Sequence, residues 1–507
     1  MRRLPISGIG GVAGISLIYW ICAGMRAAYR PFGYDELVTW YVARLPSVGA
    51  IWAAMHQGVD QEGALTHFAV RLCHCLFGPG HLATRLPALT GFWILLLGLY
   101  VFLERRLPLP YALIGMVFPM LTFAWSYAFE ARAYGVVLGS GAIALVAWQN
   151  VAEGCWRRLS LAAIAVSLAI GAGSHAFAVL IAVPLALGEG MRTLERKRLD
   201  VWVWLAMAAG ALGLLPLLNS HPATRDWDMH GLQPGLSEFP GFYDTVFRPA
   251  VAPLLFAVLA ACALTRREKE PAAAGPVLPR HESAALIGFV VAPLVFFLGH
   301  FVSHRFVFFP RYGLLCVIGV ACGSAIMMYR ASGGGRRAAA VILAVLVAWL
   351  AAARGREAFA MASEPRLQFE WSNPALVNAL ATGAPVVTID PRIFFAADYY
   401  LPADTLDRLY YVTADRETVR QYEWQDIADQ LILHEVRVLP VRAHVETLRN
   451  FAARNPHFLL HSAGAYPALY DVLLRQGWRL TLKVQSGSEW IYDVSTAETS
   501  TSGAPPR

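Results

Sequence analysis

The sequence predicts a mainly α-helical protein that crosses a membrane many times and carries a small soluble α/β domain at its C-terminal end. Of the 507 residues, 57% are hydrophobic and only 15% are charged, whereas soluble domains average about 25% charged residues. The mean hydropathy is +0.47. Long apolar runs recur between residues 5 and 353, and beyond residue 354 short apolar runs alternate with polar segments.

The basic residues indicate a membrane orientation rather than a nucleic-acid partner. The net charge is +7, but the lysines and arginines gather in short loops between apolar runs, as in membrane proteins whose basic loops face the cytoplasm. The seven cysteines are scattered and imply no disulfide framework. Cys73 and Cys75 flank His74, but residues two apart lie on different faces of a helix, so we expect no metal site there.

The first apolar run, residues 5–27, is expected to be an uncleaved membrane anchor. The chain begins with Met1 and two arginines, as signal peptides do, but the run is long and no small-residue cleavage site precedes Pro31. A basic start also places this end in the cytoplasm.

The segment 30–82 is predicted to be one long extracytoplasmic loop that rests on the membrane. Val38–His56 mixes aromatic, aliphatic and charged residues and suits an amphipathic helix at the interface. Ala64–Phe77 is apolar but too short and too polar to span, and is predicted to be a second interfacial helix. The loop carries four acids, which are Asp35, Glu36, Asp60 and Glu62.

Ten further segments are apolar enough to be predicted as spans. They are residues 84–103, 110–127, 134–150, 159–173, 175–188, 201–219, 249–265, 284–303, 307–328 and 337–353. With the first span they make about eleven. This count places every basic cluster in the cytoplasm, as the positive-inside rule requires, and the C-terminal region outside it. A full span at 64–77 would reverse that assignment.

The predicted domains are a transmembrane domain over residues 1–353, a soluble extracytoplasmic α/β domain over 354–495 and a disordered tail over 496–507. The tail is rich in Ser, Thr and Pro. Strands alternating with helices are typical of a small α/β domain. The expected elements are strands at 385–389, 408–412, 435–439 and 457–461, a helix at 465–476 and a hairpin at 479–494 around Gly487.

The polar residues of the membrane part gather on its outer side. No Asp, Glu or Lys lies in the middle of a predicted span, which counts against an ion-coupled transporter. Arginine binds phosphate oxygens in a fork, and a carboxylate takes a proton from an attacking hydroxyl or amine. The outer carboxylates, arginines and histidines are Asp35, Glu36, Arg44, Asp60, Glu62, Glu130, Arg132, His175, Arg225, Asp226, Asp228, His300, His304, Arg305 and Arg311.

These residues also admit ordinary structural roles. Asp35 and Glu36 stand where a helix cap is expected. The apolar stem of Arg132 can lie along the membrane while its charged end reaches the interface. Loop or packing roles are the alternatives for Asp60, Glu62, Arg85, His175 and His300.

Four stretches, in this order, resemble the GT-C class of polyprenyl-phosphate-sugar glycosyltransferases. They are Asp35-Glu36 after the first span, Phe77–Pro87 with His81 and Arg85, Glu130-Ala131-Arg132-Ala133-Tyr134, and Pro310-Arg311-Tyr312. More closely, the chain is similar to bacterial relatives of protein O-mannosyltransferases and of the lipid A aminoarabinose transferase. The resemblance covers residues 5–350.

The resemblance implies an inverting transfer from a sugar carried on a polyprenyl (undecaprenyl) phosphate. The implied catalytic residues are Asp35 as general base, with Glu36 beside it, and Glu130, which would orient the acceptor or Arg132. The implied substrate-binding residues are Arg132, Arg305 and Arg311 on the leaving phosphate, together with Tyr134, Tyr312, Asp60 and Glu62. Many relatives carry His-Pro-Pro where this chain has Glu62-Gly63-Ala64, so the acceptor pocket need not have the family's shape.

The resemblance also implies a multi-pass protein of the bacterial inner membrane with a periplasmic C-terminal domain. Its partners would be the lipid-linked sugar, the membrane and an extracytoplasmic glycan, lipid or protein acceptor, with no nucleic acid. It implies no certain cofactor, although some members of the wider class use a divalent cation. Two other functions stay open, a lipid-linked sugar flippase or exporter and a non-catalytic assembly protein for an envelope polysaccharide.

Overall fold

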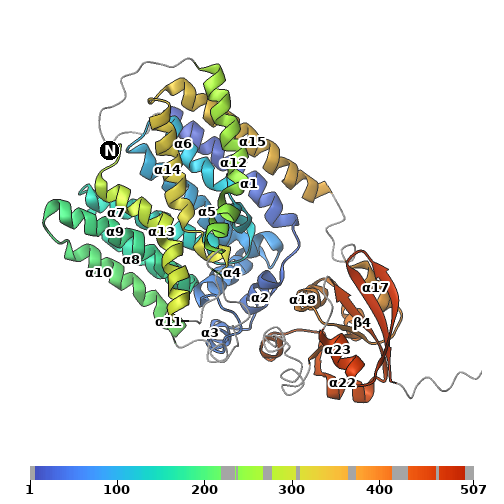
Figure 1. Cartoon of the computed structure of the whole chain (residues 1–507). Coiled ribbons are helices and arrows are strands. Elements are labelled where there is room, and N and C mark those ends of the chain that lie inside the picture. Colours follow the sequence, from blue (N-terminus) through green and yellow to red (C-terminus); the bar gives the residue numbers. More distant parts are fainter. Residues whose placement is uncertain are drawn as a thin grey trace, which may run out of the picture. The chain divides into compact units, whose positions relative to one another are not determined.

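The computed structural model describes residues 6–218, 235, 238–265, 277–303, 309–363, 373–413, 432–463 and 468–496. They form two compact units (Figure 1). Unit 1 comprises Met1–Tyr29 and Ile51–Ser363, and unit 2 comprises Arg30–Ala50 and Glu364–Arg507. This division differs from the predicted one in two places. The last long helix runs ten residues beyond 353, and the first part of the loop 30–82 belongs with the C-terminal residues.

Unit 1 is built of helices. Its elements are α1 (Ile6–Tyr29), α3 (Val48–His56, whose first residues are counted with unit 2), α4 (Ala64–Phe77), α5 (His81–Glu104), α6 (Leu109–Val117), η1 (Phe118–Leu121), η2 (Phe123–Phe129), α7 (Tyr134–Ala152), α8 (Arg157–Ser174), η3 (Ala176–Ile181), α9 (Ala182–Arg196), α10 (Val201–Ala211), η4 (Leu212–Leu214), α11 (Leu215–Leu218), α12 (Glu238–Leu264), α13 (Arg280–Ser303), η6 (Pro310–Gly313), α14 (Cys316–Ala331) and α15 (Arg336–Ser363).

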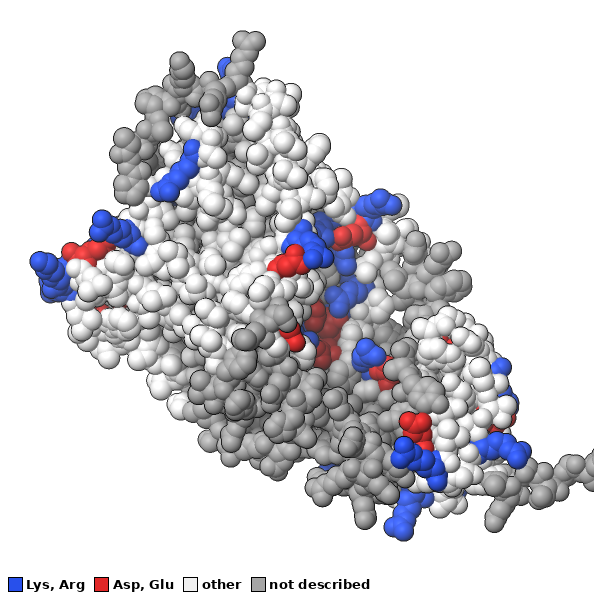
Figure 2. All heavy atoms as spheres, viewed as in Figure 1, with Lys and Arg blue, Asp and Glu red and all other residues white. Residues whose placement is uncertain are grey.

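Seven helices among the described residues are long and apolar enough to cross a membrane, which makes this a multi-pass membrane protein. They start at Gly8, His81, Tyr134, Ala176, Glu238, Arg280 and Arg336. The pair Leu109–Leu121 and Phe123–Phe129, bent by 78°, makes an eighth if it is one span. The other three predicted spans correspond to the shorter or less apolar helices α8, α10–α11 and α14, so the count of eleven stays a prediction. On the face shown in Figure 2, most of the surface of these helices is uncharged.

The predicted interfacial helix over Val38–His56 is in fact two helices. The first, α2 (Tyr34–Ala43), ends at Arg44, and α3 begins at Val48. Pro46 lies between them. A proline has no N–H for the helical ladder and disfavours helical geometry in the residue before it, so a single helix through this position is strained. The second interfacial prediction, Ala64–Phe77, coincides with α4.

Helices α5 and α7 pack closely because glycines face one another. A Cβ atom on Gly91 would lie 2.5 Å from the backbone of Gly135, and one on Gly139 would lie 2.4 Å from the carbonyl oxygen of Gly91. Small residues allow such approach between membrane helices, where van der Waals contact rather than water exclusion holds the pair. This contact fixes the start of α7, which is where Tyr134 lies.

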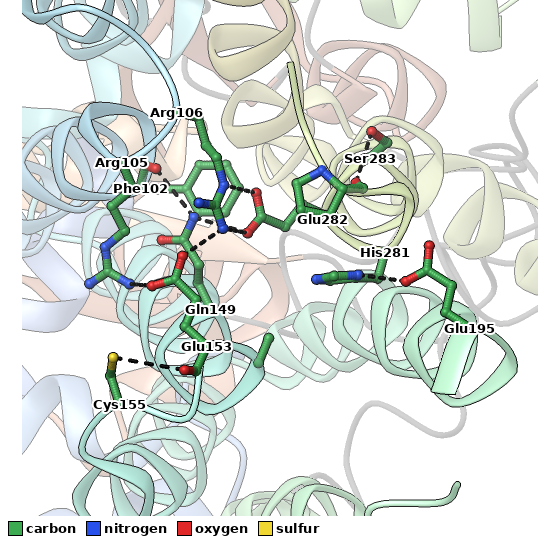
Figure 3. Close-up of polar contacts among 12 residues, drawn as sticks. Phe102, Arg105, Arg106, Gln149, Glu153, Cys155, Glu195, His281, Glu282 and Ser283 are labelled. Carbon is green, nitrogen blue, oxygen red and sulfur yellow. Dashed lines mark hydrogen bonds and ion pairs between the residues drawn. The ribbon is translucent and has the colours of Figure 1, made fainter. Parts of the chain in front are cut away.

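An ion pair between the half-buried Arg106 and the buried Glu282 joins the ends of α5, α7 and α13 (Figure 3). Arg106 donates to both carboxylate oxygens of Glu282, at 2.9 and 2.5 Å, and Gln149 donates to one of them at 3.2 Å. Glu282 is fully buried. Arg106 therefore holds three helix ends together.

A second group of charges joins α7, α8 and α9. Glu189 accepts from the indole N–H of Trp148 at 3.0 Å and from Arg192, while Asp200 accepts from Arg192 and, with both oxygens, from Arg157. The predicted span 175–188 ended just before Glu189, but α9 continues through Arg196. An acid therefore does lie within an apolar helix here, paired with arginine as a buried charge requires.

Unit 2 is an α/β domain together with the segment Arg30–Ala50. Its elements are α2, α17 (Pro374–Ala381), β1 (Val386–Thr388), α18 (Pro391–Tyr400), α19 (Ala403–Leu406), β2 (Leu409–Thr413), β3 (His444–Thr447), α22 (Leu448–Arg454), β4 (His457–Ala463), α23 (Ala468–Arg475), β5 (Arg479–Ser486) and β6 (Glu489–Ser495). The sheet order is β3-β2-β1-β4-β6-β5. Strands β3, β2, β1 and β4 run parallel, and β5–β6 is an antiparallel hairpin.

One predicted strand is wrong. Residues 432–435 are helical and 436–438 form a turn, so the strand expected at 435–439 lies instead at His444–Thr447. A five-residue apolar alternation does not by itself distinguish a strand from the end of a helix. Here the backbone turns after Glu435, because the Glu435 carbonyl accepts from the Leu439 N–H at 2.8 Å. Pro440 follows this turn. The hairpin around Gly487 and the other three strands match the prediction.

Candidate active site

The loop between α3 and α4 carries Asp60 and Glu62 and is held against the end of α8. The Gly63 N–H donates to the carbonyl of Ser174 at 2.7 Å, and the Thr66 hydroxyl donates to the same oxygen at 3.3 Å. A Cβ on Gly63 would lie 1.9 Å from the carbonyl oxygen of Gly173. Only glycine allows this approach, so the loop is placed by backbone contact.

Arg132 brings both acids of this loop together. Its Nη1 donates to the two carboxylate oxygens of Asp60 at 3.2 and 3.0 Å, and its Nε lies 2.9 Å from Glu62 Oε1. The same Glu62 oxygen accepts from the Ala133 N–H at 2.8 Å. All three side chains are buried, with Arg132 8% exposed. The predicted phosphate-binding arginine therefore already has two carboxylate partners.

His67 on α4 completes this group, since its Nε2 lies 3.4 Å from Asp60 Oδ2 and its side chain is fully buried. Burial alone raises the pKa of Asp60, but the charge of Arg132 and the contact with His67 lower it more, and the pKa lies well below its ordinary value. Asp60 is therefore a carboxylate at neutral pH. The sequence does not connect His67 with this site, because the length and polarity of Ala64–Phe77 carry no information on which distant residues it meets.

A second group of predicted residues lines a small cavity in the same unit. Tyr134, His175, Arg311 and Tyr312 border a space of about 20 Å³ with apolar neighbours. The His175 ring lies 5.4 Å from the ring of Tyr134 and 5.8 Å from that of Tyr312. The guanidinium of Arg311 lies over the ring of Phe309, at 4.7 Å from its centre.

His175 stands between α8 and η3, outside the candidate span that starts at Ala176. Burial, and then the charge of Arg132, lower its pKa to about 3. The imidazole is therefore neutral at physiological pH, and its Nδ1 accepts from the Phe177 N–H at 3.2 Å. These contacts support the packing role considered for His175 from the sequence.

Asp35 and Glu36 lie on α2, in unit 2. Glu36 is buried, accepts from the Gly33 N–H at 3.0 Å and lies 3.4 Å from Arg30. This is the glutamate half of a capping box. Asp35 is half-buried in the first turn, and its carbonyl accepts from the Thr39 hydroxyl. The two adjacent acids therefore have different surroundings. The Glu36 side chain supplies the capping contact, because it accepts from the backbone N–H of the N-cap residue Gly33.

For the other predicted residues the structure gives few contacts, and some of them lie outside the described residues. Glu130 is half-buried at the end of η2, and its carbonyl accepts from the Arg132 N–H at 2.7 Å. Arg305, His304, Arg225, Asp226 and Asp228 lie outside the described residues. Within the described ranges, no group of three or more His, Cys, Asp or Glu side chains is arranged to hold a metal ion.

Comparison with known proteins identifies the fold. No protein-family model matches the chain, and no curated protein matches it. Crystal structures of ArnT from Cupriavidus metallidurans, in the apo state and bound to undecaprenyl phosphate, each match at 12% identity with a TM-score of 0.54, over 98% of this chain and 99% of that chain.

A second likeness is weaker. The oligosaccharyltransferase AglB from Archaeoglobus fulgidus, solved with an inhibitory peptide and a dolichol-phosphate, matches at 15% identity with a TM-score of 0.32, over 86% of this chain and 60% of that chain. That score is too low to support an argument. The ArnT match covers both units and confirms the predicted mainly α membrane architecture with a C-terminal α/β domain. The chain therefore has the fold seen in these ArnT structures.

Proposed function

We propose that the chain is an integral membrane glycosyltransferase, which moves a sugar from a polyprenyl-phosphate donor to an acceptor outside the cytoplasm. The observation that carries this proposal is the full-length likeness in fold to ArnT, one structure of which holds undecaprenyl phosphate. The likeness includes the α/β domain, which a shared set of membrane helices alone would not explain. The bacterial cytoplasmic membrane, with the C-terminal domain outside, is part of the proposal and is supported by the one-sided distribution of basic loops.

The proposed chemistry is a direct displacement with inversion. Asp35 accepts the proton of the acceptor hydroxyl or amine while that atom attacks the anomeric carbon of the donor sugar. The bond from that carbon to the phosphate oxygen breaks, and its electron pair stays on the leaving polyprenyl phosphate. Asp35 is assigned this role because the family resemblance puts the base at the first acid of the pair. The Glu36 carboxylate has a structural role, since it accepts from the Gly33 N–H at the start of α2 and lies 3.4 Å from Arg30.

A positive charge beside the leaving phosphate stabilises the negative charge that develops on it, and Arg311 is the first candidate for this role. Arg311 lines the small cavity with Tyr134 and Tyr312, and an arginine can bind two phosphate oxygens at once. Arg132 is assigned mainly to holding the loop of Asp60 and Glu62, because two carboxylates already surround it. Arg305 keeps its proposed place on the phosphate, and Glu130 its place in orienting the acceptor or Arg132.

Transfer by purified protein is the test. Wild type, Asp35→Asn and Arg311→Ala are placed in nanodiscs with a polyprenyl-phosphate sugar, and mass spectrometry follows release of polyprenyl phosphate and glycosylation of envelope lipids and glycans. Asp35→Asn should lose most turnover and keep donor affinity. Arg311→Ala should weaken donor binding roughly ten- to hundredfold, since a bond to a charged group contributes about 1.5–3 kcal/mol. Asp244→Asn, an exposed acid on α12, is the matched control.

The alternatives predict other outcomes. A lipid-linked sugar flippase would move the donor across the bilayer without releasing polyprenyl phosphate, and an assembly protein would do neither. Either result for wild type would overturn the proposal. Repeating the assay with a chelator and then with added divalent cations tests the cation requirement. Comparing envelope glycans and glycolipids with and without the gene identifies the sugar and the acceptor.

A further inference from the structure

The helix that carries Asp35 is held by the C-terminal α/β domain. Helices α2 and α18 pack side by side within unit 2 (Figure 1). Segments more than 350 residues apart in the chain are therefore one compact body, and the domain contributes directly to the surroundings of the proposed base.

A tyrosine at each end of α2 anchors the helix to a buried carboxylate. The Tyr34 hydroxyl donates to both oxygens of Glu435, at 2.9 and 2.8 Å. The Tyr41 hydroxyl donates to Asp398. Asp398 also accepts from the backbone N–H groups of Arg442 and Ala443, both at 2.7 Å. Both carboxylates are buried, and that of Asp398 is fixed by three donors from two other segments.

Aromatic contacts and one backbone bond complete the attachment. The Phe32 N–H, just before α2, donates to the Tyr400 hydroxyl at 2.8 Å. The rings of Tyr34 and Phe395 are 5.4 Å apart, and those of Trp40 and Tyr399 are 4.9 Å apart, both edge to face. Such packing leaves little freedom for α2 to slide or rotate on α18.

The spacing of the two anchors fixes the rotation of α2 about its own axis. Tyr34 and Tyr41 are two helical turns apart and so lie on the same face of the helix. Asp35 follows Tyr34 directly and is rotated about 100° from it at 3.6 residues per turn. The face held by the domain therefore determines where Asp35 points, and Asp35 stays half-buried rather than enclosed.

We infer that Tyr34, together with its acceptor Glu435 on the C-terminal domain, is a positioning residue for Asp35. This inference rests on the proposed function, in which Asp35 is the general base. The α/β domain then acts in catalysis as the support that holds the base in its reactive orientation. Tyr41 and Asp398 supply the second anchor. Misplacing a catalytic group by about 1 Å can cost roughly a hundredfold in rate, so a lost anchor should appear in turnover.

A double-mutant cycle tests the inference. Turnover, donor affinity and thermal unfolding are measured for wild type, Tyr34→Phe, Asp35→Asn and the variant with both changes. Tyr34→Phe keeps the ring and removes only the hydroxyl. It should lower kcat about ten- to hundredfold with little change in the KM for the donor. In the Asp35→Asn background, the same change should have almost no further effect, because a positioning residue acts only through the group that it positions.

Two further variants separate positioning from folding. Glu435→Gln keeps an oxygen that accepts from Tyr34 and should recover part of the turnover lost in Glu435→Ala. Tyr410→Phe changes a tyrosine on β2 of the same domain for which the described residues show ring contacts but no hydroxyl hydrogen bond. It should have wild-type kcat. If Glu435→Ala unfolds, Tyr34→Phe and Glu435→Gln still report on the anchor, since the first removes a single hydroxyl and the second keeps the shape of the side chain.

The outcomes are distinct. If Asp35→Asn is inactive but Tyr34→Phe has normal kcat, the inference is overturned and the proposed function stands. If Tyr34→Phe slows both backgrounds equally, its role is structural only and the inference is again overturned. If Asp35→Asn turns over normally, Asp35 is not the base, and this inference fails while the transferase function stands. If wild type transfers no sugar, the proposed function fails and this inference fails with it.

Discussion

Arg132 donates a hydrogen bond from Nη1 to each carboxylate oxygen of Asp60, at 3.2 and 3.0 Å, in a site where both side chains are buried. The two residues are 72 positions apart. Glu62 and His67 extend the contact on either side. An arginine that the family resemblance assigns to a lipid phosphate thus also organises the loop between α3 and α4 of its own chain.

Replacing Arg132 by alanine is therefore expected to destabilise unit 1. The change leaves Asp60 and Glu62 buried without their guanidinium, and removing one partner of a buried ion pair costs about 3–5 kcal/mol. Thermal unfolding of the purified protein in detergent should show a markedly lower midpoint for Arg132→Ala. Arg248→Ala, which changes an exposed arginine on α12, is the control and should unfold close to wild type. Equal midpoints for the two variants would mean that the Asp60 contact does not hold the fold.

Stability should also decline in acid through Asp60. Its pKa in the folded protein lies below the ordinary 3.8, because Arg132 and His67 outweigh the effect of burial. The unfolded chain therefore takes up this proton at higher pH than the folded one. The contribution is fully present above pH 3.8 and is lost as the pH falls below it. The melting-temperature difference between wild type and Asp60→Asn should narrow below about pH 4; a constant difference would contradict this assignment.

Substitutions at the two adjacent acids of α2 should distinguish the proposed catalytic base, Asp35, from the helix-capping residue, Glu36. Asp35→Asn removes the proton acceptor and Asp35→Glu displaces it, and we expect both to lose most transfer activity while still binding donor. Glu36→Gln should be milder, because an amide oxygen still accepts from the Gly33 N–H. Turnover of a polyprenyl-phosphate sugar is the measurement. Near-normal turnover in Asp35→Asn would shift suspicion to Glu130 or Asp60.

Gly63 should tolerate no side chain. A Cβ would lie 1.9 Å from the Gly173 carbonyl oxygen, so Gly63→Ala must displace the loop that carries Asp60 and Glu62. Overpacking of this kind costs about 1–3 kcal/mol or more, and donor turnover should fall with it. Gly323→Ala on α14, where a Cβ meets nothing within 4 Å, is the control and should be neutral. Wild-type unfolding of Gly63→Ala would show that the loop is not held by this contact.

The topology is open to direct measurement. Reporter fusions at residue 80 and just after α15, which ends at Ser363, should both report an extracytoplasmic location. The reason is the one-sided distribution of basic loops along the chain. A cytoplasmic signal from either fusion would reject the eleven-span prediction and reverse the proposed side of the site.

Some features of the protein are determined by local sequence. Most of the predicted apolar runs are helical where the structure describes them, since hydropathy over 17 to 25 positions is a property of the run itself. The run 110–127 is bent by 78° between η1 and η2, and the helix over 249–265 begins already at Glu238. The Glu36 cap on Gly33 is also local, because the two residues are one helical turn apart. The predicted secondary structure was wrong where one local feature of the sequence favours a helix or strand and another interrupts it. Pro46 divided a predicted helix, and the short apolar alternation at 435–439 became a helix end and a turn.

Only the tertiary structure decided which of the candidate residues meet. Asp60 and Arg132, Tyr34 and Glu435, and Arg106 and Glu282 are each joined across many intervening residues. Nothing in the period of a helix or the polarity of a loop specifies these pairs, because they depend on how distant elements pack. The same holds for the division of the chain, in which the segment of Asp35 belongs with the C-terminal domain. Local sequence specifies the elements and their buried faces, whereas pairing requires the folded chain to bring each buried charge to a partner that offsets its desolvation.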